Sequence, residues 1–212
     1  MSVVPFPPMK RPLVAILRGV RPDEVEGIVS ALIESGMTAI EIPLNSPDPF
    51  RSIEVAVRMA PAGVMVGAGT VLTLEAVERL HDVGGRLLVA PNVDPDIIAR
   101  ARARGMVTMP GVFTPTEALL AAKAEASSLK FFPASVLGAA GITAIRAVFP
   151  ADLMIAAVGG VSDRNFVEYT RAGIVAFGLG SSLYKPGMTA AEVAVRARAT
   201  INAYDMAIQQ AG

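Results

Sequence analysis

Cysteine is absent from the 212-residue sequence, and histidine occurs once, at His81. Without cysteine the chain has no disulfide, no thiolate metal ligand and no cysteine nucleophile. A zinc or iron site built on several histidines of one chain is also excluded, because such sites need more than one imidazole. His81 lies near the end of an amphipathic segment that stops at Gly84, and a basic side chain is favourable at a helix C-terminus. We therefore expect no bound metal and interpret His81 as structural.

The sequence also lacks an excess of charge and any long apolar run. Its 19 basic and 19 acidic side chains cancel, and no basic stripe indicates a nucleic-acid partner. No apolar run is long enough to cross a membrane, and residues 1–12 lack the features of a signal peptide. We expect a cytoplasmic protein that binds neither nucleic acid nor membranes. The proline-rich residues 1–12 are interpreted as an arm leading into a short helix or straight into the first strand.

Short apolar runs without strict alternation recur along the chain, as is typical of parallel strands buried on both faces. Segments with helical spacing lie between them, with Asp, Thr or Pro at their starts and Gly at their ends. Eight such units in this length predict a single-domain (β/α)8 barrel over residues 1–212. A doubly wound open sheet is the alternative, but AILRGVRP is not the glycine-rich fingerprint that usually follows its first strand. The predicted strands occupy residues 13–17, 38–43, 64–69, 86–91, 106–110, 129–133, 154–160 and 174–180.

Three ionisable residues, Arg18, Glu41 and Lys130, lie within or directly after otherwise apolar predicted strands. In a barrel the carboxyl ends of the strands carry the chemistry, so these side chains are expected to converge on one pocket. Burial favours the neutral amine of Lys130, whereas Glu41 opposes that shift. A neutral amine forms a Schiff base with a carbonyl, and Glu41 is then the natural proton shuttle. We expect the neighbouring leucine and phenylalanines of LKFF to supply the apolar surroundings.

The last two predicted strands end in VGGVS and GLGSS. Backbone N–H groups of such loops can bind a phosphate, and barrels often bind phosphate after strands seven and eight. The hydroxyl groups of Ser181 and Ser182 could donate further hydrogen bonds or cap the next helix.

Together, the ordered motifs EIPLNSP, GAGTV, APN, LKFFP, AVGGV and GLGSSLY resemble the aldolases of 2-keto-3-deoxy-6-phospho sugar acids. The resemblance spans nearly the whole chain. It implies a class I, metal-independent barrel enzyme, usually a homotrimer, with no cofactor beyond a covalent imine on Lys130 and with Glu41 as general acid/base. Binding roles also follow from it: Arg18 and Thr70 at the pyruvate carboxylate, Pro91 and Phe132 lining that site, and Gly159, Gly160, Gly180 and Ser181 at the phosphate. Ser182 is added to the phosphate site because it adjoins Ser181.

Two features resemble the 6-phosphogalactonate branch of that family rather than the 6-phosphogluconate branch. PLNSP follows Glu41 where the gluconate branch typically has TLRT, and Val158 replaces the threonine before the paired glycines. A valine withdraws a hydroxyl hydrogen bond, which can change the epimer that a site accepts. The resemblance thus implies cleavage of 2-dehydro-3-deoxy-6-phosphogalactonate to pyruvate and D-glyceraldehyde 3-phosphate. The gluconate epimer, a non-catalytic phosphosugar-binding barrel and an imine-free barrel isomerase or synthase stay open as alternatives.

Overall fold

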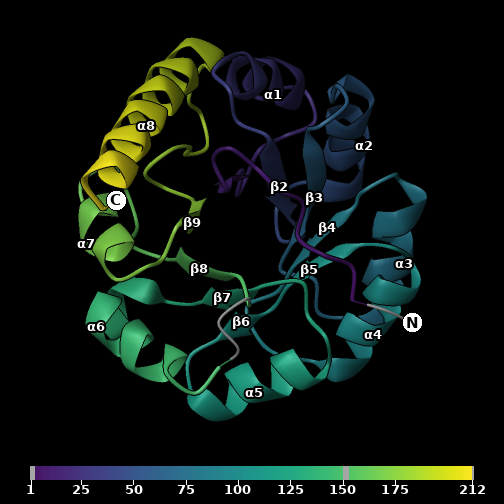
Figure 1. The fold of residues 1–212 in the computed structure, drawn as a ribbon. Helices are drawn as coiled ribbons and strands as arrows, with labels where there is room; N and C mark the ends of the chain where they lie inside the picture. The colour runs from purple at the N-terminus through teal and green to yellow at the C-terminus, as the bar shows by residue number, and fades with distance from the viewer. Residues whose placement is uncertain (1–2, 150–152, 212) are drawn as a thin grey trace.

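The structure, a computed structural model, describes residues 3–149 and 153–211 and forms a barrel of parallel strands surrounded by helices (Figure 1). The strands are β1 Leu13–Ile16, β2 Ala39–Pro43, β3 Met65–Gly69, β4 Leu87–Val89, β5 Val107–Met109, β6 Gly111–Val112, β7 Leu129–Phe131, β8 Ile155–Val158 and β9 Ala176–Leu179. The helices are α1 Val25–Glu34, α2 Pro49–Met59, α3 Leu74–Asp82, α4 Pro95–Ala103, α5 Pro115–Lys123, α6 Ala134–Arg146, α7 Phe166–Arg171 and α8 Ala190–Ala211.

The fifth strand was predicted to end at Pro110, but it extends to Val112 and is divided in two at this proline, which lacks a backbone N–H. The sheet order is β5-β4-β3-β2-β1-β9-β8-β7-β6, so the two ends of the sheet are consecutive in the chain. The backbone oxygens of Thr108 and Pro110 accept hydrogen bonds from Ser128 and Lys130, at 3.1 and 2.9 Å, which joins this strand to β7. The predicted (β/α)8 barrel is confirmed, and the open doubly wound sheet is excluded.

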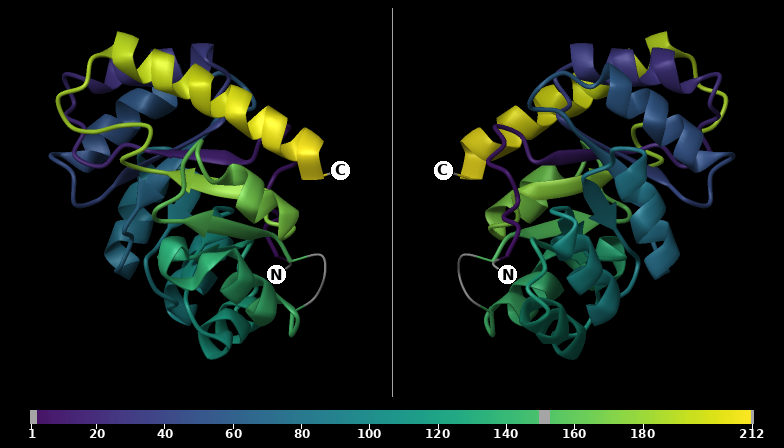
Figure 2. Two further views of the ribbon diagram at one scale, coloured as in Figure 1. Left: turned by 90° about the vertical axis from the view of Figure 1, so that its left-hand side faces the viewer. Right: turned by 90° about the vertical axis from the view of Figure 1, so that its right-hand side faces the viewer.

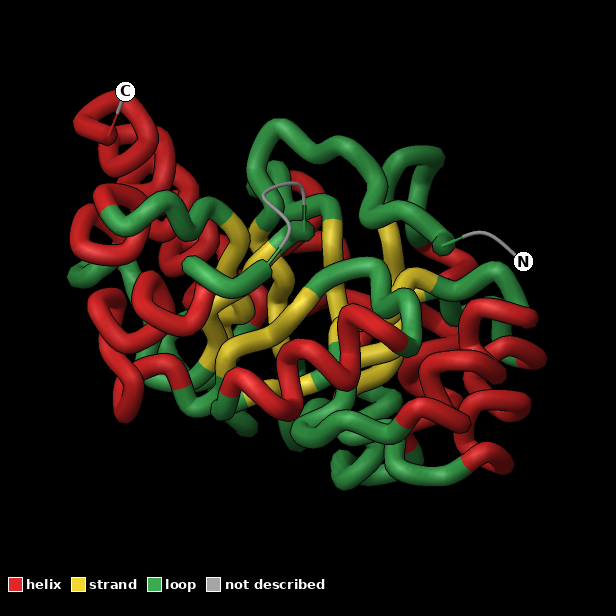
Figure 3. The backbone as a smooth tube through the Cα atoms, turned by 60° about the horizontal axis from the view of Figure 1, so that its bottom comes forward, coloured by secondary structure: helices red, strands yellow, loops and turns green. Residues whose placement is uncertain are grey.

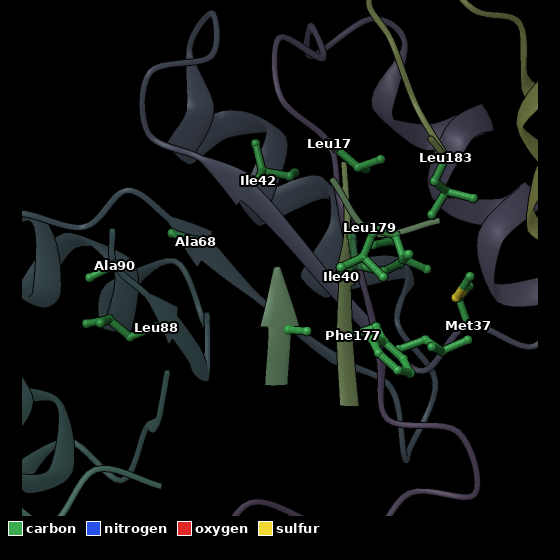
Figure 4. Close-up of a cluster of buried hydrophobic side chains, with 14 of the residues drawn as sticks. Leu17, Met37, Ile40, Ile42, Ala68, Leu88, Ala90, Phe177, Leu179 and Leu183 are labelled. Carbon is green, nitrogen blue, oxygen red and sulfur yellow. The ribbon is translucent and has the colours of Figure 1, made fainter. Parts of the chain in front are cut away.

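The strands separate two apolar regions because consecutive side chains of a strand point to opposite faces. The larger region fills the layer between the strands and the helices, where Leu17, Ile40 and Phe177 are fully or almost fully buried (Figure 4). The smaller region fills the barrel interior and includes Val14 and Met109. Figure 3 shows the helices outside the ring of strands, as this two-region packing requires.

Capping residues predicted from the sequence are found at the starts of the helices in the structure. The Thr73 hydroxyl accepts a hydrogen bond from the Ala76 N–H at 3.1 Å and caps α3. Thr114 and Glu117 form a capping box at the start of α5. His81 lies in the last turn of α3, as predicted.

Residues 3–12 contain no helix or strand and lead straight into β1. Val4, Phe6 and Met9 pack against the apolar cluster of the barrel interior. The Arg11 guanidinium donates to both carboxylate oxygens of Asp205 on α8, at 2.7 and 2.6 Å. Helix α8 in turn packs against α1 and α7 along one side of the barrel (Figure 2). The arm is thus fastened to the helix layer at one end and to the barrel interior along its apolar side chains.

Candidate active site

A cavity of about 670 Å³ opens at the carboxyl ends of the strands. Every site residue proposed from the sequence lines this cavity, although the residues come from all but two of the nine strands or from the loops directly after them. The lining includes Arg18, Glu41, Thr70, Pro91, Lys130, Phe132, Val158, Gly159, Gly160, Gly180, Ser181 and Ser182. The barrel therefore brings together residues that are up to 164 positions apart, the span from Arg18 to Ser182.

Glu41 lies on β2 with its side chain inside the barrel, 3% exposed. Its Oε2 atom is buried and has no hydrogen-bond partner among the residues that the structure describes. Gly69, at the end of the neighbouring β3, makes room for this carboxylate, because a Cβ there would lie 2.1 Å from Oε2. An unpaired buried carboxyl oxygen is costly and needs an explanation. Its position in the cavity supplies one: this oxygen is available to a bound molecule.

Lys130 is the second buried ionisable residue of the cavity, 7% exposed. It pairs with Gly111 and Ala156 on the neighbouring strands, and its side chain points into the barrel. Leu129 and Phe131 point the opposite way, into the layer between strands and helices. The expectation that they surround the lysine amine is therefore wrong, because alternation along a strand separates them from it.

The apolar surroundings of Lys130 come instead from the barrel interior and from Phe132, whose ring centroid lies 4.8 Å from the amine Nζ. Phe132 itself is 37% exposed and lies at the cavity wall. The aromatic ring therefore lies beside the amine in the wall of the cavity.

The Lys130 amine and the Glu41 carboxyl titrate far from their ordinary ranges. Burial raises the pKa of Glu41 from 4.5 to about 7, against the opposing effects of the Lys130 and Arg18 charges and the Gly69 backbone hydrogen bond. Burial lowers the pKa of Lys130 from 10.5 to about 8; Glu41 opposes this shift and Arg18 adds to it. Near neutral pH the pair can thus offer a nucleophilic amine and a carboxyl group that exchanges protons.

Arg18 and Thr70 stand at the mouth of the cavity, after β1 and β3. Arg18 is exposed, and its Nη1 donates a hydrogen bond to Asn45 Oδ1 at 2.5 Å. Thr70 has φ of +57°, an unusual value for a β-branched residue. Such strained backbone tends to occur at functional sites, where the surrounding structure maintains it.

Another part of the cavity wall is formed by the loops after β8 and β9, and β9 is the neighbour of β1 in the sheet. Gly159 and Gly160 have φ of +90° and +78°, and a Cβ on Gly160 would lie 2.4 Å from the Ser135 Cβ. The Ser182 hydroxyl donates to the Val161 backbone oxygen at 3.1 Å, which ties the two loops together. In contrast to the capping alternative, Ser181 and Ser182 lie in a turn well before α8 begins at Ala190.

Val158 lies in the barrel wall between these loops and Ile16 of β1. Its side chain fits because residue 178 is glycine: a Cβ there would lie 2.7 Å from Val158 Cγ2. Val158 is 5% exposed and lines the cavity with an apolar surface.

Seven further residues line the cavity. Val161, Ser162 and Gly178 belong to the VGGVS and GLGSS loops proposed from the sequence, whereas Ile16, Asp163, Arg164 and Arg196 were not proposed as site residues. The residues after the paired glycines carried a usable signal, since they directly follow a predicted strand end. Arg196 carried none, because it lies in the second turn of α8, and only tertiary packing brings its Nη1 to 3.4 Å from the Ser181 backbone oxygen.

Among residues 3–149 and 153–211, no group of three or more His, Asp or Glu side chains is arranged to hold a metal ion. No helix of these two segments is long and apolar enough to cross a membrane.

Comparison with known proteins places the chain in a family. The model of the KDPG and KHG aldolases matches residues 9–195. The chain belongs to the KDPG and KHG aldolase family. As a member of an aldolase family, it is a lyase, and the family expected from the strand-end motifs is confirmed.

Several individual aldolases are similar over almost their full length. A probable 2-dehydro-3-deoxy-6-phosphogalactonate aldolase of Rhizobium meliloti is 71% identical over 97% of each chain. The 2-dehydro-3-deoxy-6-phosphogalactonate aldolase of Escherichia coli is 44% identical over 94% of this chain and 98% of its own. The solved structure of native KDPGal superposes with a TM-score of 0.93 at 44% identity, covering 95% of this chain and 98% of that one.

Proposed function

We propose that this chain is a class I aldolase that reversibly cleaves 2-dehydro-3-deoxy-6-phosphogalactonate to pyruvate and D-glyceraldehyde 3-phosphate. The observation that carries the proposal is the buried Lys130 amine, which shares one cavity with a buried and unpaired Glu41 oxygen. The names of the two curated relatives at 71% and 44% identity support the choice of substrate.

The reaction begins when the neutral amine of Lys130 attacks the C2 ketone of the substrate. Glu41 supplies the proton with which the resulting carbinolamine loses water, and a protonated imine remains on Lys130. Glu41, directly or through a water, then accepts the C4 hydroxyl proton while the C3–C4 bond breaks. Glyceraldehyde 3-phosphate leaves, and the electron pair of the broken bond forms an enamine. Protonation at C3 and hydrolysis of the imine release pyruvate and restore the amine, so no metal or organic cofactor is required.

The remaining cavity residues are proposed to hold the two charged ends of the substrate. Arg18 and Thr70 would bind the carboxylate next to the ketone, and Pro91 and Phe132 would line the pyruvate half of the site. The phosphate would lie against backbone N–H groups after β8 and β9, with the hydroxyl groups nearby. This phosphate subsite comprises Gly159, Gly160, Gly180, Ser181 and Ser182.

The test is borohydride reduction in the presence of pyruvate, followed by peptide mass spectrometry. A reduced pyruvate adduct on Lys130 is expected, and Lys130→Met should abolish it. Lys123→Met, which alters an exposed lysine on α5, is the matched control and should retain the adduct. Absence of an adduct from the unaltered protein would favour the imine-free isomerase or the non-catalytic phosphosugar-binding barrel.

The preference for the galactonate epimer is assigned to Val158, whose apolar surface faces the cavity. The kcat/KM of the purified protein should be higher for the 6-phosphogalactonate substrate than for its 6-phosphogluconate epimer. Val158→Thr restores a hydroxyl group and should raise the relative kcat/KM for the gluconate epimer by about tenfold. Equal kcat/KM values for both epimers in the unaltered protein would instead indicate a dual-specificity aldolase.

We further propose that the chain forms a homotrimer in the cytoplasm. The resemblance to the family carries this proposal, and exposed apolar side chains such as Val136, 70% exposed, and Val148, 58% exposed, allow an interface. Sedimentation equilibrium should give the mass of three 22.0 kDa chains. A monomer mass at micromolar concentration would contradict the trimer.

A further inference from the structure

Two adjacent side chains after β2 bind the loop after β1. Arg18 Nη1 donates to Asn45 Oδ1 at 2.5 Å, and the Gly19 backbone N–H donates to Ser46 Oγ at 2.9 Å. The Leu17 N–H also donates to the Glu41 backbone oxygen, at 2.9 Å, so the parallel ladder continues up to the residue before Arg18. The backbone at Arg18 is therefore fixed on its β2 side.

The same backbone is restrained from the β9 side. Gly19 has φ of +84°, and a Cβ at this residue would lie 2.7 Å from Pro186 Cγ. Gly19 thus lies close beneath the loop that leads to α8. The main chain is therefore restrained on both sides of the Arg18 Cα. These restraints do not set the direction of the long arginine side chain.

Asn45 determines that direction. An exposed arginine samples many rotamers, and ordering it on binding costs affinity. The hydrogen bond from Nη1 to Asn45 Oδ1 holds the planar guanidinium before a ligand arrives, and the guanidinium has further N–H donors with which to bind a carboxylate.

The chemical type of Asn45 also matters. An amide oxygen accepts the hydrogen bond without neutralising the guanidinium. A carboxylate in the same place would pair with Arg18 and compete with a ligand carboxylate for the same positive charge. A neutral acceptor therefore orients the arginine and leaves its charge available.

We propose that Asn45 is a positioning residue, which holds Arg18 for the carboxylate of the keto acid. This inference rests on the proposed function, because Arg18 is assigned there to the pyruvate carboxylate. Asn45 is outside the cavity lining and acts through Arg18 rather than by contact with the substrate. It follows β2, which carries Glu41, so one short segment serves both the proton shuttle and the carboxylate subsite.

The experiment measures imine formation with two carbonyl compounds, of which only one has a carboxylate. The rate of borohydride inactivation is measured at increasing concentrations of pyruvate or of acetaldehyde. The proteins compared are the unaltered protein, Asn45→Ala, Asn45→Asp and the control Asn202→Ala, which alters an exposed asparagine on α8. Asn45→Ala should raise the half-saturating pyruvate concentration by about tenfold, the size expected for a hydrogen bond to a charged group. The value for acetaldehyde should not change, and Asn202→Ala should match the unaltered protein.

Two further comparisons separate positioning from a merely structural role. Asn45→Asp retains a hydrogen-bond acceptor, yet it should also raise the pyruvate value, because it adds a competing negative charge. In an Arg18→Ala background, Asn45→Ala should have no additional effect, because the group through which it acts is gone.

The inference is overturned if Asn45→Ala leaves the pyruvate value unchanged, or if it raises the values for pyruvate and acetaldehyde equally. An undiminished effect in the Arg18→Ala background would also overturn it. These outcomes differ from failure of the proposed function, in which the unaltered protein itself forms no adduct on Lys130.

Discussion

Replacement of Glu41 by glutamine should make the Lys130 amine easier to deprotonate. Glu41→Gln removes the negative charge that stabilises the ammonium form and retains nearly the same volume. Burial and the Arg18 charge, which both lower the pKa of Lys130, remain in place. The pKa of Lys130 is therefore expected to fall below its value of about 8.

The size of this change follows from the burial of both groups. An opposite charge inside a protein shifts a neighbouring pKa by about one to three units. With a decrease of about one unit, the neutral fraction of Lys130 at pH 7 rises from about one tenth to about one half. Turnover should nevertheless fall by about 100-fold or more, because the variant lacks the carboxyl group that we propose as the proton shuttle. A larger neutral fraction of Lys130 combined with slower turnover is therefore the result expected if Glu41 both stabilises the ammonium form and transfers protons.

The amine is best followed with a reagent that needs no proton relay. Acetic anhydride acetylates neutral amines, and peptide mass spectrometry reports the rate at Lys130 between pH 6 and pH 10, with exposed Lys123 as the reference for reagent delivery. The half-maximal pH at Lys130 should be lower in Glu41→Gln than in the unaltered protein. A half-maximal pH that stays the same or rises would refute the electrostatic coupling between the two groups.

Three other predictions concern stability and geometry. Burial raises the pKa of Glu41 from 4.5 to about 7, so between these two pH values the folded protein holds a proton that the unfolded chain has released. The contribution of Glu41 to stability therefore falls as the pH rises from 4.5 to about 7. The free energy of unfolding of Glu41→Gln, measured in urea, should therefore rise by about 2 kcal/mol relative to that of the unaltered protein between pH 5 and pH 7. Parallel pH profiles of the two proteins would contradict this. Gly69→Ala places a Cβ 2.1 Å from Glu41 Oε2 and should lower kcat by about tenfold or more, whereas the control Gly27→Ala on α1, whose Cβ would lie 3.6 Å from the Ala190 Cβ, should not. Equal kcat values for the two alanine variants would show that the carboxylate tolerates displacement. Arg11→Met removes the ion pair with Asp205 and should cost about 1 kcal/mol at low salt and less at about 1 M salt, measured by thermal unfolding. No loss at low salt would show that the arm is held by its apolar side chains alone.

The order of strands and helices was predictable because it depends on local signals. Apolar runs, capping residues such as Thr114 and terminal glycines lie within a few positions of the boundaries that they specify. The division of the fifth strand was not predicted, although Pro110 was visible in the sequence. A proline at this position indicates the end of a strand, and only closure of the barrel shows that the chain continues as β6.

The candidate site was accessible from the sequence to the extent that it follows strand ends. Arg18, Glu41 and Lys130 could be proposed because parallel strands of one barrel bring their carboxyl ends to one side. Asn45 was noted only as part of the PLNSP motif, which does not show that its side chain meets Arg18. Arg196 was not singled out, because an arginine on a helix has no unusual neighbours in the sequence.

The sequence by itself determined the barrel, the family and the identity of the buried amine and carboxyl group, since each depends on residue type and short-range spacing. The tertiary structure alone decided which side chains face Lys130, that Glu41 Oε2 lacks a partner, and in which direction the pKa values of the pair shift. These properties depend on distances across the barrel and on the exclusion of water from its interior. Strand alternation, closure at Pro110 and the small size of Gly69 and Gly178 set those distances, and no local pattern records them.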